Sequence, residues 1–163
     1  MQDKKHRKRM IFYGALTFLI MCCIFFMSAQ DGEESGRLSE GFLGSFLGTL
    51  LERLLPELSD QGAAHDIRKY AHMFEYLCLG LSSFLFFFEA CFRRRRRALC
   101  TLAAALLFCF LYACSDEWHQ SFVPGRAGRF TDVLIDSAGY CAGIFLLTLI
   151  KCSRPLDKSR KKG

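Results

Sequence analysis

Four long runs of apolar residues, almost free of charge, constrain this chain more than any other feature of its sequence. The runs are residues 10–29, 70–88, 98–115 and 133–150. Inside them the charged or imidazole side chains are His72, Glu75 and Asp136, which lie toward one end of their runs. A helix needs about 20 apolar residues to cross the hydrocarbon core of a bilayer, with roughly 17 as the lower limit. The sequence therefore predicts four membrane-spanning helices.

The nine cysteines do not suggest a disulfide framework. Most lie inside the apolar runs, and Cys91 and Cys152 lie beside basic clusters. The sequence contains no CxxC pair. We interpret the cysteines as small buried hydrophobic residues, not as disulfides or zinc ligands.

Basic residues gather in three clusters, at residues 4–9, 93–97 and 151–162. In a chain that crosses the membrane four times, all three clusters fall on one side, which the positive-inside rule assigns to the cytoplasm. The predicted fold is an all-α integral membrane four-helix bundle with both termini cytoplasmic. The arginine run at 93–97 is expected to anchor this topology and attract anionic lipid, not nucleic acid.

We expect a single membrane domain over residues 1–163. The expected segments are helices at about 10–29, 69–91, 98–119 and 131–150, an outer loop at 30–68 and a basic tail at 151–163. A cleaved signal peptide ending near Ala29 is an alternative for the first segment, although its apolar run is long for that role.

The outer loop has an apolar pattern of its own. Leucine and phenylalanine recur at helical spacing from Phe42 to Leu55, Ser39 suits an N-cap, and Pro56 ends the run. This predicts an amphipathic helix on the outer membrane surface or at the mouth of the bundle.

Polar residues of the four helices are expected at a common depth. Counted from the basic clusters, Ser28, Glu75, Asp116 and Asp132 each lie roughly 27–28 Å along their helices, near the outer boundary of a core of about 30 Å. Asp136 lies one turn deeper. The predicted helices thus bring these groups to the outer end of the bundle.

Helical phase supports the same convergence. Arg68, His72 and Glu75 share one face of their helix. Asp136 shares a face with Gly139 and Gly143, whose spacing allows close helix approach and would turn that face into the bundle. The polar faces are therefore expected to meet in an outward-opening pocket. The same two glycines could instead join copies of the chain into a homo-oligomer.

Arg126 and Arg129 depart from the positive-inside pattern, because they lie in a short outer segment. A guanidinium group suits phosphate or carboxylate, so Arg126 could hold an anion beside the turn at residues 123–125. Alternatively, the two arginines pair with nearby carboxylates. The candidates for that pairing are Asp116, Glu117, Asp132 and Asp136.

Taken together, these residues resemble the VanZ-like family. The resemblance rests on Ser28-x-Gln30, Arg68-Lys69-x-x-His72-x-x-Glu75-Tyr76, Asp116-Glu117-x-His119-Gln120-x-Phe122-Val123-Pro124-Gly125-Arg126, and Asp132-x-x-x-Asp136-x-x-Gly139-x-x-x-Gly143. It implies a small multi-pass protein of the bacterial cell membrane. The name-giving member of the family is associated with resistance to the glycopeptide teicoplanin. Where this chain has Asp136, the resemblance leads us to expect Asn in many relatives.

Three functions fit these observations. The first is binding of an anionic cell-envelope component, such as a lipid head group or a cell-wall precursor. Its candidate ligand-binding residues are Ser28, Gln30, Arg68, Gln120, Arg126, Asp132 and Asp136. The second is a membrane hydrolase or transferase acting on a lipid-linked phosphate, with His119 as general base or nucleophile. Its candidate catalytic residues are His72, Glu75, Asp116, Glu117 and His119.

The third function is purely structural, with the polar residues locking the helices together. No cofactor is implied. The polar residues include ligand types for a divalent metal, but no metal motif such as HExxH supports one. The expected partners are membrane lipids and the anionic envelope component.

Overall fold

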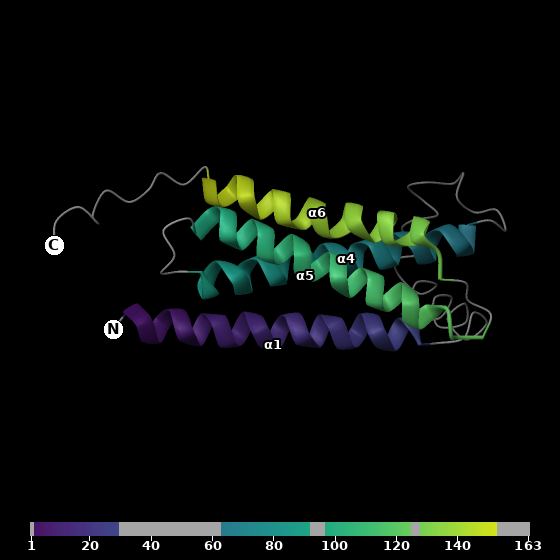
Figure 1. Cartoon of the computed structure of the whole chain (residues 1–163), viewed down its shortest axis with the longest axis horizontal. Coiled ribbons are helices and arrows are strands. Elements are labelled where there is room, and N and C mark those ends of the chain that lie inside the picture. Colours follow the sequence, from purple (N-terminus) through teal and green to yellow (C-terminus); the bar gives the residue numbers. More distant parts are fainter. Residues whose placement is uncertain (1, 30–62, 92–96, 125–127, 153–163) are drawn as a thin grey trace, which may run out of the picture.

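The computed structural model describes residues 2–29, 63–91, 97–124 and 128–152, which form four helices. They are α1 (Gln2–Ser28), α4 (Ala63–Ala90), α5 (Arg97–Gln120) and α6 (Phe130–Cys152). In Figure 1 the helices lie side by side along the long axis of the molecule. The predicted outer-loop helix lies outside the described residues.

All four helices are long and apolar enough to cross a membrane. The candidate spans are Lys4–Ser28, Tyr70–Ala90, Ala98–Gln120 and Phe130–Lys151. The prediction of an all-helical membrane protein with four spans is confirmed. The side of the membrane on which the termini lie stays a prediction.

Two helices begin earlier than expected. The expected helix at about 10–29 begins at Gln2, and the one at about 69–91 begins at Ala63. The apolar run marks the part of a helix that crosses lipid, whereas lysine, arginine and alanine continue a helix readily beyond it. Hydrophobicity therefore located the spans but not the first turns of α1 and α4.

Helix α4 is central to the bundle and packs most extensively against α6 and α1, while α1 touches α5 only narrowly. Three glycines bring α4 and α6 into backbone contact. A Cβ atom would lie 2.4 Å from the Tyr140 carbonyl oxygen at Gly80, 2.3 Å from the Met73 oxygen at Gly139, and 2.5 Å from the Leu77 oxygen at Gly143. Such distances leave no room for a side chain. The Gly139–Gly143 face therefore packs inside the chain, and its use in an oligomer stays a prediction.

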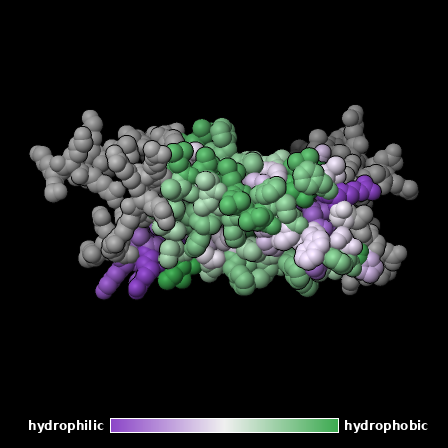
Figure 2. All heavy atoms as spheres, in the orientation of Figure 1, coloured by the Kyte–Doolittle hydropathy of each residue, from purple (hydrophilic) through white to green (hydrophobic). Residues whose placement is uncertain are grey.

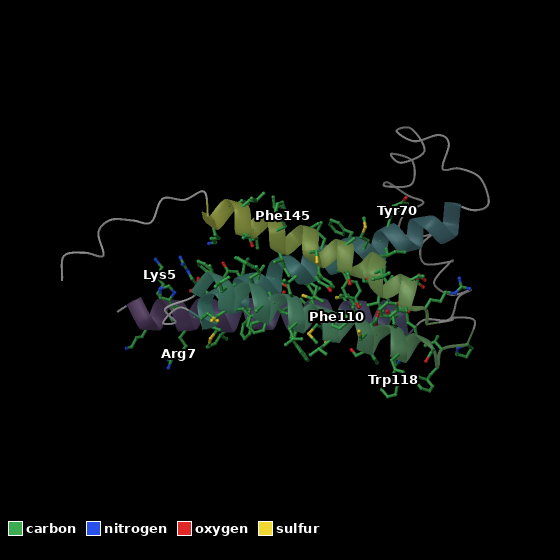
Figure 3. The ribbon with its side chains drawn as sticks, turned by 45° about the horizontal axis from the view of Figure 1, so that its top comes forward. Lys5, Arg7, Tyr70, Phe110, Trp118 and Phe145 are labelled. Atoms are coloured by element: carbon green, nitrogen blue, oxygen red, sulfur yellow. The ribbon has the colours of Figure 1, made fainter. Side chains whose placement is uncertain are left out.

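The surface of the bundle suits a lipid environment. Large apolar side chains such as Phe18, Leu107 and Phe145 are exposed, and Figure 2 shows hydrophobic residues over the middle of the molecule with hydrophilic ones toward its ends. Figure 3 shows the same order, with Lys5 and Arg7 at one end and Trp118 toward the other. The cysteines of the described residues are free, as expected.

The two ends of the bundle differ in charge. At the end where α1 begins and α4 finishes, called the basic end here, Glu89 of α4 is buried. His6 of α1 contacts one Glu89 oxygen through Nδ1, and Arg9 lies 3.9 Å from the other. Lys151 of α6 lies over the Phe88 ring, 4.7 Å from its centroid. Basic side chains of two helices thus surround one buried carboxylate and the aromatic ring beside it.

Candidate functional site

At the opposite end of the bundle, all four helices contribute polar side chains to one cluster, which we call the acidic cluster. Its members are Ser28 of α1, His72, Glu75 and Tyr76 of α4, Asp116, Glu117 and Gln120 of α5, and Asp136 of α6. The cluster lies where α1 and α5 finish and where α4 and α6 begin. It is a set of buried and half-buried groups at the edge of the apolar spans, where polar side chains are costly to keep.

Asp116 is the most heavily contacted carboxylate of the cluster. Its Oδ2 atom accepts hydrogen bonds from the Ser28 hydroxyl at 3.0 Å and the Tyr76 hydroxyl at 3.4 Å. The same oxygen lies 3.2 Å from His72 Nε2. In contrast, Oδ1 of Asp116 is buried and has no hydrogen-bond partner among the residues that the structure describes. The carboxylate therefore joins three helices through one oxygen and leaves the other unused.

Gln120 lies one helical turn beyond Asp116, so both side chains project from the same face of α5. Its amide nitrogen lies 3.0 Å from Asp116 Oδ2, 3.2 Å from Glu117 Oε1, 3.4 Å from the Ser28 hydroxyl and 3.3 Å from His72 Nε2. An amide nitrogen carries only two hydrogens, so it serves at most two of these four neighbours at a time. Hydrogen-bond donors are thus in short supply within the cluster.

His72 has a carboxylate beside each ring nitrogen. Nδ1 lies 3.2 Å from Glu75 Oε2, one turn along α4, and Nε2 faces α5 through Asp116 and Gln120. The ring also packs edge-to-face on Tyr76, with centroids 5.3 Å apart. Contacts from three directions fix the orientation of the imidazole.

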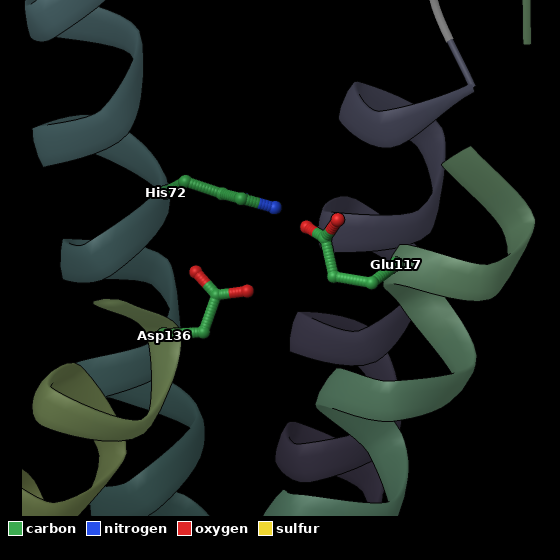
Figure 4. A group of neighbouring side chains, drawn as sticks. All are labelled: His72, Glu117 and Asp136. Atoms are coloured by element: carbon green, nitrogen blue, oxygen red, sulfur yellow. The ribbon is translucent and has the colours of Figure 1, made fainter. Parts of the chain in front are cut away.

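Glu117 and Asp136 complete the cluster from α5 and α6. One ligand atom from each of His72, Glu117 and Asp136 lies within 4.8 Å of the other two, and Figure 4 shows the three side chains turned toward a common centre. Asp136 is only 1% exposed, and no described residue forms a hydrogen bond with its Oδ2 atom. This is the donor arrangement of a candidate metal site.

The electrostatic balance of the cluster is strongly acidic. Four carboxylates, from Glu75, Asp116, Glu117 and Asp136, surround one imidazole. Glu117 accepts a hydrogen bond from Arg129, but the donor is the backbone N–H, at 3.1 Å. The Arg129 side chain is exposed and forms no ion pair within the described residues. The described residues thus give no support to pairing of Arg129 with these carboxylates, and the same pairing of Arg126 stays a prediction.

The sequence matches the model of the VanZ/LLP1 family over residues 13–151, which is most of the chain. The chain belongs to the VanZ/LLP1 family. No curated protein matches the sequence closely enough to count as a relative, and no solved structure does either. The expected family resemblance is confirmed.

In this VanZ-family protein, most of the residues singled out from the sequence meet in the acidic cluster. They are Ser28, His72, Glu75, Asp116, Glu117, Gln120 and Asp136. Gln30 and Arg126 lie outside the described residues. Arg68 lies in α4, but its side chain is outside the described part. Their predicted role in binding an anion stays a prediction.

Two candidates point elsewhere. The ring of His119 packs on Phe25 of α1, with centroids 4.5 Å apart, and its buried Nδ1 has no hydrogen-bond partner within the described ranges. Asp132 is half-buried at the start of α6, where its carboxylate accepts a hydrogen bond from Thr131 at 3.4 Å. Neither side chain shares a hydrogen bond with the acidic cluster within the described residues.

Two residues that shape the cluster were not among the candidate site residues, although Tyr76 is part of the motif that indicated the family. Tyr76 lies one turn after His72 on the same face of α4, so helical phase would have included it. Gly128 lies against α5, where a Cβ atom would be 2.3 Å from the Glu117 carbonyl oxygen. This close approach lets the backbone N–H of Arg129 reach the Glu117 side chain, and no sequence pattern indicates it.

Proposed function

We propose that this VanZ-family protein binds an anionic component of the cell envelope, the phosphate-bearing head group of a lipid or of a lipid-linked cell-wall precursor, at the acidic end of the bundle. The proposed setting is the bacterial cell membrane, with both termini in the cytoplasm and the acidic cluster near the outer surface. The three basic clusters of the sequence support this orientation through the positive-inside rule.

The observation that supports a ligand site at this end of the bundle is the incomplete hydrogen bonding of two buried carboxylates. Among the described residues, Oδ1 of Asp116 and Oδ2 of Asp136 have no hydrogen-bond partner, although both side chains are almost fully buried. A network that only locked helices together would be expected to satisfy its acceptors, because each buried unsatisfied acceptor costs about 1–3 kcal/mol. Unsatisfied groups at the edge of a membrane span therefore favour a ligand site over a purely structural role.

Arginine chemistry indicates the charge of the proposed ligand. Arg129 is held beside the cluster through the bond from its backbone N–H to Glu117, while its guanidinium is exposed and without an ion pair in the described part of the chain. The sequence places Arg126 three residues earlier. Guanidinium groups bind phosphate through two parallel hydrogen bonds, so a head-group phosphate is the ligand that suits them.

Binding to phosphate lipids tests the proposal directly. The detergent-purified protein is titrated with a synthetic polyprenyl phosphate, with phosphatidylglycerol and with uncharged diacylglycerol, and complexes are counted by native mass spectrometry. We expect a phosphate lipid to bind more tightly than diacylglycerol. We also expect Arg129→Ala to weaken that binding at least about tenfold, as for loss of a hydrogen bond to a charged group.

The matched control is Arg7→Ala, which removes an exposed arginine at the basic end. It should leave binding unchanged. Preference for polyprenyl phosphate would identify a lipid-linked precursor, and preference for phosphatidylglycerol a membrane phospholipid. Equal binding of all three lipids, or equal loss in both arginine variants, would contradict the proposal.

A role in glycopeptide resistance is a further part of the proposal. It is supported by membership of the VanZ/LLP1 family and by the proposed outward orientation of the acidic cluster. In a susceptible bacterium that produces the protein, we expect tolerance of teicoplanin to rise, and to fall back with Arg129→Ala. Unchanged tolerance with the wild-type protein would contradict this part alone.

A second candidate function is hydrolysis or transfer on a lipid-linked phosphate. The convergence of His72, Glu117 and Asp136 favours it, because imidazole and carboxylate groups are the ligands of catalytic metal sites. Release of inorganic phosphate from the polyprenyl phosphate would support this function. Tight binding with no release would favour a binding protein.

A further inference from the structure

The acidic cluster lacks positive charge for the number of carboxylates that it holds. If Glu75, Asp116, Glu117 and Asp136 are ionised, even a protonated His72 leaves an excess of negative charge at the edge of the membrane. Burial of unpaired charge is strongly unfavourable, so such groups pair, take up protons or coordinate metals. The described residues of the cluster supply no second cationic side chain.

We propose that His72, Glu117 and Asp136 bind one divalent transition-metal ion. This inference rests on the proposed function, because it takes the acidic cluster as the ligand site. It adds a metal cation, whose positive charge would allow the cluster to bind an anion. Two observations support it independently, namely the geometry of the three ligand atoms and the missing partner of Asp136.

The geometry fits a single ion with little rearrangement. Ligand atoms bonded to one ion at about 2.1 Å lie roughly 3–4 Å apart. The three ligand atoms here lie within 4.8 Å of one another, so small side-chain rotations would bring them to bonding distance. They come from α4, α5 and α6, so one ion would connect three helices.

The second observation is the state of Asp136. This side chain is 1% exposed and points toward the centre of the cluster in Figure 4, yet its Oδ2 atom has no hydrogen-bond partner in the part of the chain that the structure describes. A cation is a natural partner for a buried carboxylate oxygen that receives no hydrogen bond. An acidic cluster formed only to hold helices together gives no reason for this oxygen to stay unpaired.

The surroundings of His72 match those of a metal ligand. Metal-binding histidines usually donate the N–H of the second ring nitrogen to a carboxylate or carbonyl, which fixes the tautomer and the ring orientation. Here Nδ1 contacts Glu75, which leaves Nε2 turned toward α5. Binding of the ion would release a proton from Nε2 to solvent if His72 is charged in the ion-free protein, and Asp116 would remain as a neighbouring acceptor.

The donor set indicates the class of ion. Imidazole favours Zn²⁺ and related transition metals, whereas carboxylates also suit Mn²⁺. One nitrogen and two carboxylates therefore favour Zn²⁺ or Mn²⁺ over Ca²⁺, which takes six to eight oxygen ligands. With three protein ligands, the ion would keep an open position for a phosphate oxygen.

The test uses the full chain in detergent, freed of metal by chelation and titrated separately with Zn²⁺, Mn²⁺ and Co²⁺ in the absence of added lipid. We expect one ion per chain by elemental analysis. Asp136→Asn, which keeps the shape of the side chain, should weaken binding about 100-fold, since even mutation of a group that merely orients a ligand commonly costs 10–100-fold. His72→Gln should change the visible absorption of bound Co²⁺.

Glu89→Gln is the matched control, because it neutralises a buried carboxylate of α4 at the basic end. It should leave the affinity for metal unchanged. Far-UV circular dichroism of each ion-free variant separates a lost ligand from a lost fold. A folded wild-type chain that retains less than one ion, or equal affinity in Asp136→Asn and wild type, would overturn the inference.

A lipid titration with and without EDTA separates this inference from the proposed function. If the bound metal ion contacts the lipid phosphate, EDTA should weaken binding of the phosphate lipid. Lipid binding by a chain that takes up no metal would leave the proposed function standing and overturn the metal site. Metal binding by a chain that does not bind phosphate lipids would support the metal site and overturn the proposed function.

Discussion

The two ends of the bundle hold buried carboxylates in opposite ways. At the basic end, the buried carboxylate of Glu89 faces two basic side chains, and each of its oxygens has a partner. At the acidic end, four carboxylates face one imidazole, and two of their buried oxygens have no hydrogen-bond partner among the described residues. The comparison shows that burial of charge has no single meaning in this protein. A carboxylate with a partner for each oxygen fits a structural role, whereas a cluster with more acceptors than donors indicates a site for a ligand.

The largest expected effect comes from separating the helices that hold the acidic end together. In Gly139→Leu, the new side chain meets the Met73 carbonyl oxygen, which cannot move aside as a flexible side chain would. We expect stability to fall by about 3 kcal/mol, the upper part of the range for overpacked cores. The measurement is thermal unfolding in detergent by far-UV circular dichroism.

Ala138→Leu is the control for this change, because the neighbouring Ala138 is exposed on the same helix. It should unfold within a few degrees of the wild-type protein. Equal behaviour of the two variants would contradict the backbone contact of α4 with α6 as the basis of the cluster.

A smaller loss is expected at the basic end from His6→Ala. This change removes the closest partner of buried Glu89 and leaves only Arg9, at 3.9 Å. The cost should be about 2 kcal/mol, as for a buried acceptor deprived of its partner. The same unfolding measurement applies, with Lys5→Ala as the exposed control. If His6→Ala is as stable as the control, the basic end is not a structural ion pair.

Tyr76→Phe should have a smaller effect still. The hydroxyl of Tyr76 donates a 3.4 Å hydrogen bond to Asp116 Oδ2, which also has a donor in Ser28. We expect a loss of about 1 kcal/mol, typical of one hydrogen bond. Tyr70→Phe, at an exposed tyrosine of the same helix, provides the comparison. A loss several times larger would mean that Tyr76 holds more of the cluster than its contacts indicate.

The smallest change in stability, and the one that separates the two ends, is expected from Asp136→Asn in the ion-free protein. Removing one of several carboxylates relieves repulsion, so stability should stay the same or rise by up to about 1 kcal/mol. Glu89→Gln should instead destabilise the protein, because it weakens an attractive pair. If both variants lose the same stability, the two ends do not differ as proposed.

Much of this architecture follows from simple properties of the sequence. The lengths of the apolar runs located the four spans. Counting residues along each helix correctly predicted that Ser28, Asp116 and Asp136 lie at the same end of the bundle. Helical phase also turned His72 and Glu75 to the same side of α4. These predictions succeeded because the rise and turn of a helix depend little on its surroundings.

The features that the sequence did not predict depend on how each helix is rotated about its axis relative to its neighbours. A three-residue offset keeps Glu75 beside His72 on α4, but on α5 the same offset leaves His119 against Phe25, because α1 packs on that side of the helix. Glu89 was not singled out from the sequence, since its partners His6 and Arg9 lie on another helix within a run of basic residues. Such pairings arise from tertiary contacts that no local pattern encodes.

The glycine contacts between α4 and α6 have a consequence for how the protein can vary. Main chain touches main chain at Gly80, Gly139 and Gly143, and these small residues let α4 and α6 approach closely enough for His72 and Asp136 to meet. The lipid-facing residues of both helices lie away from these contacts and do not set the spacing between α4 and α6. Substitutions at these positions can adapt the protein to the composition and thickness of the host membrane, while the distance between the His72 imidazole and the Asp136 carboxylate stays the same.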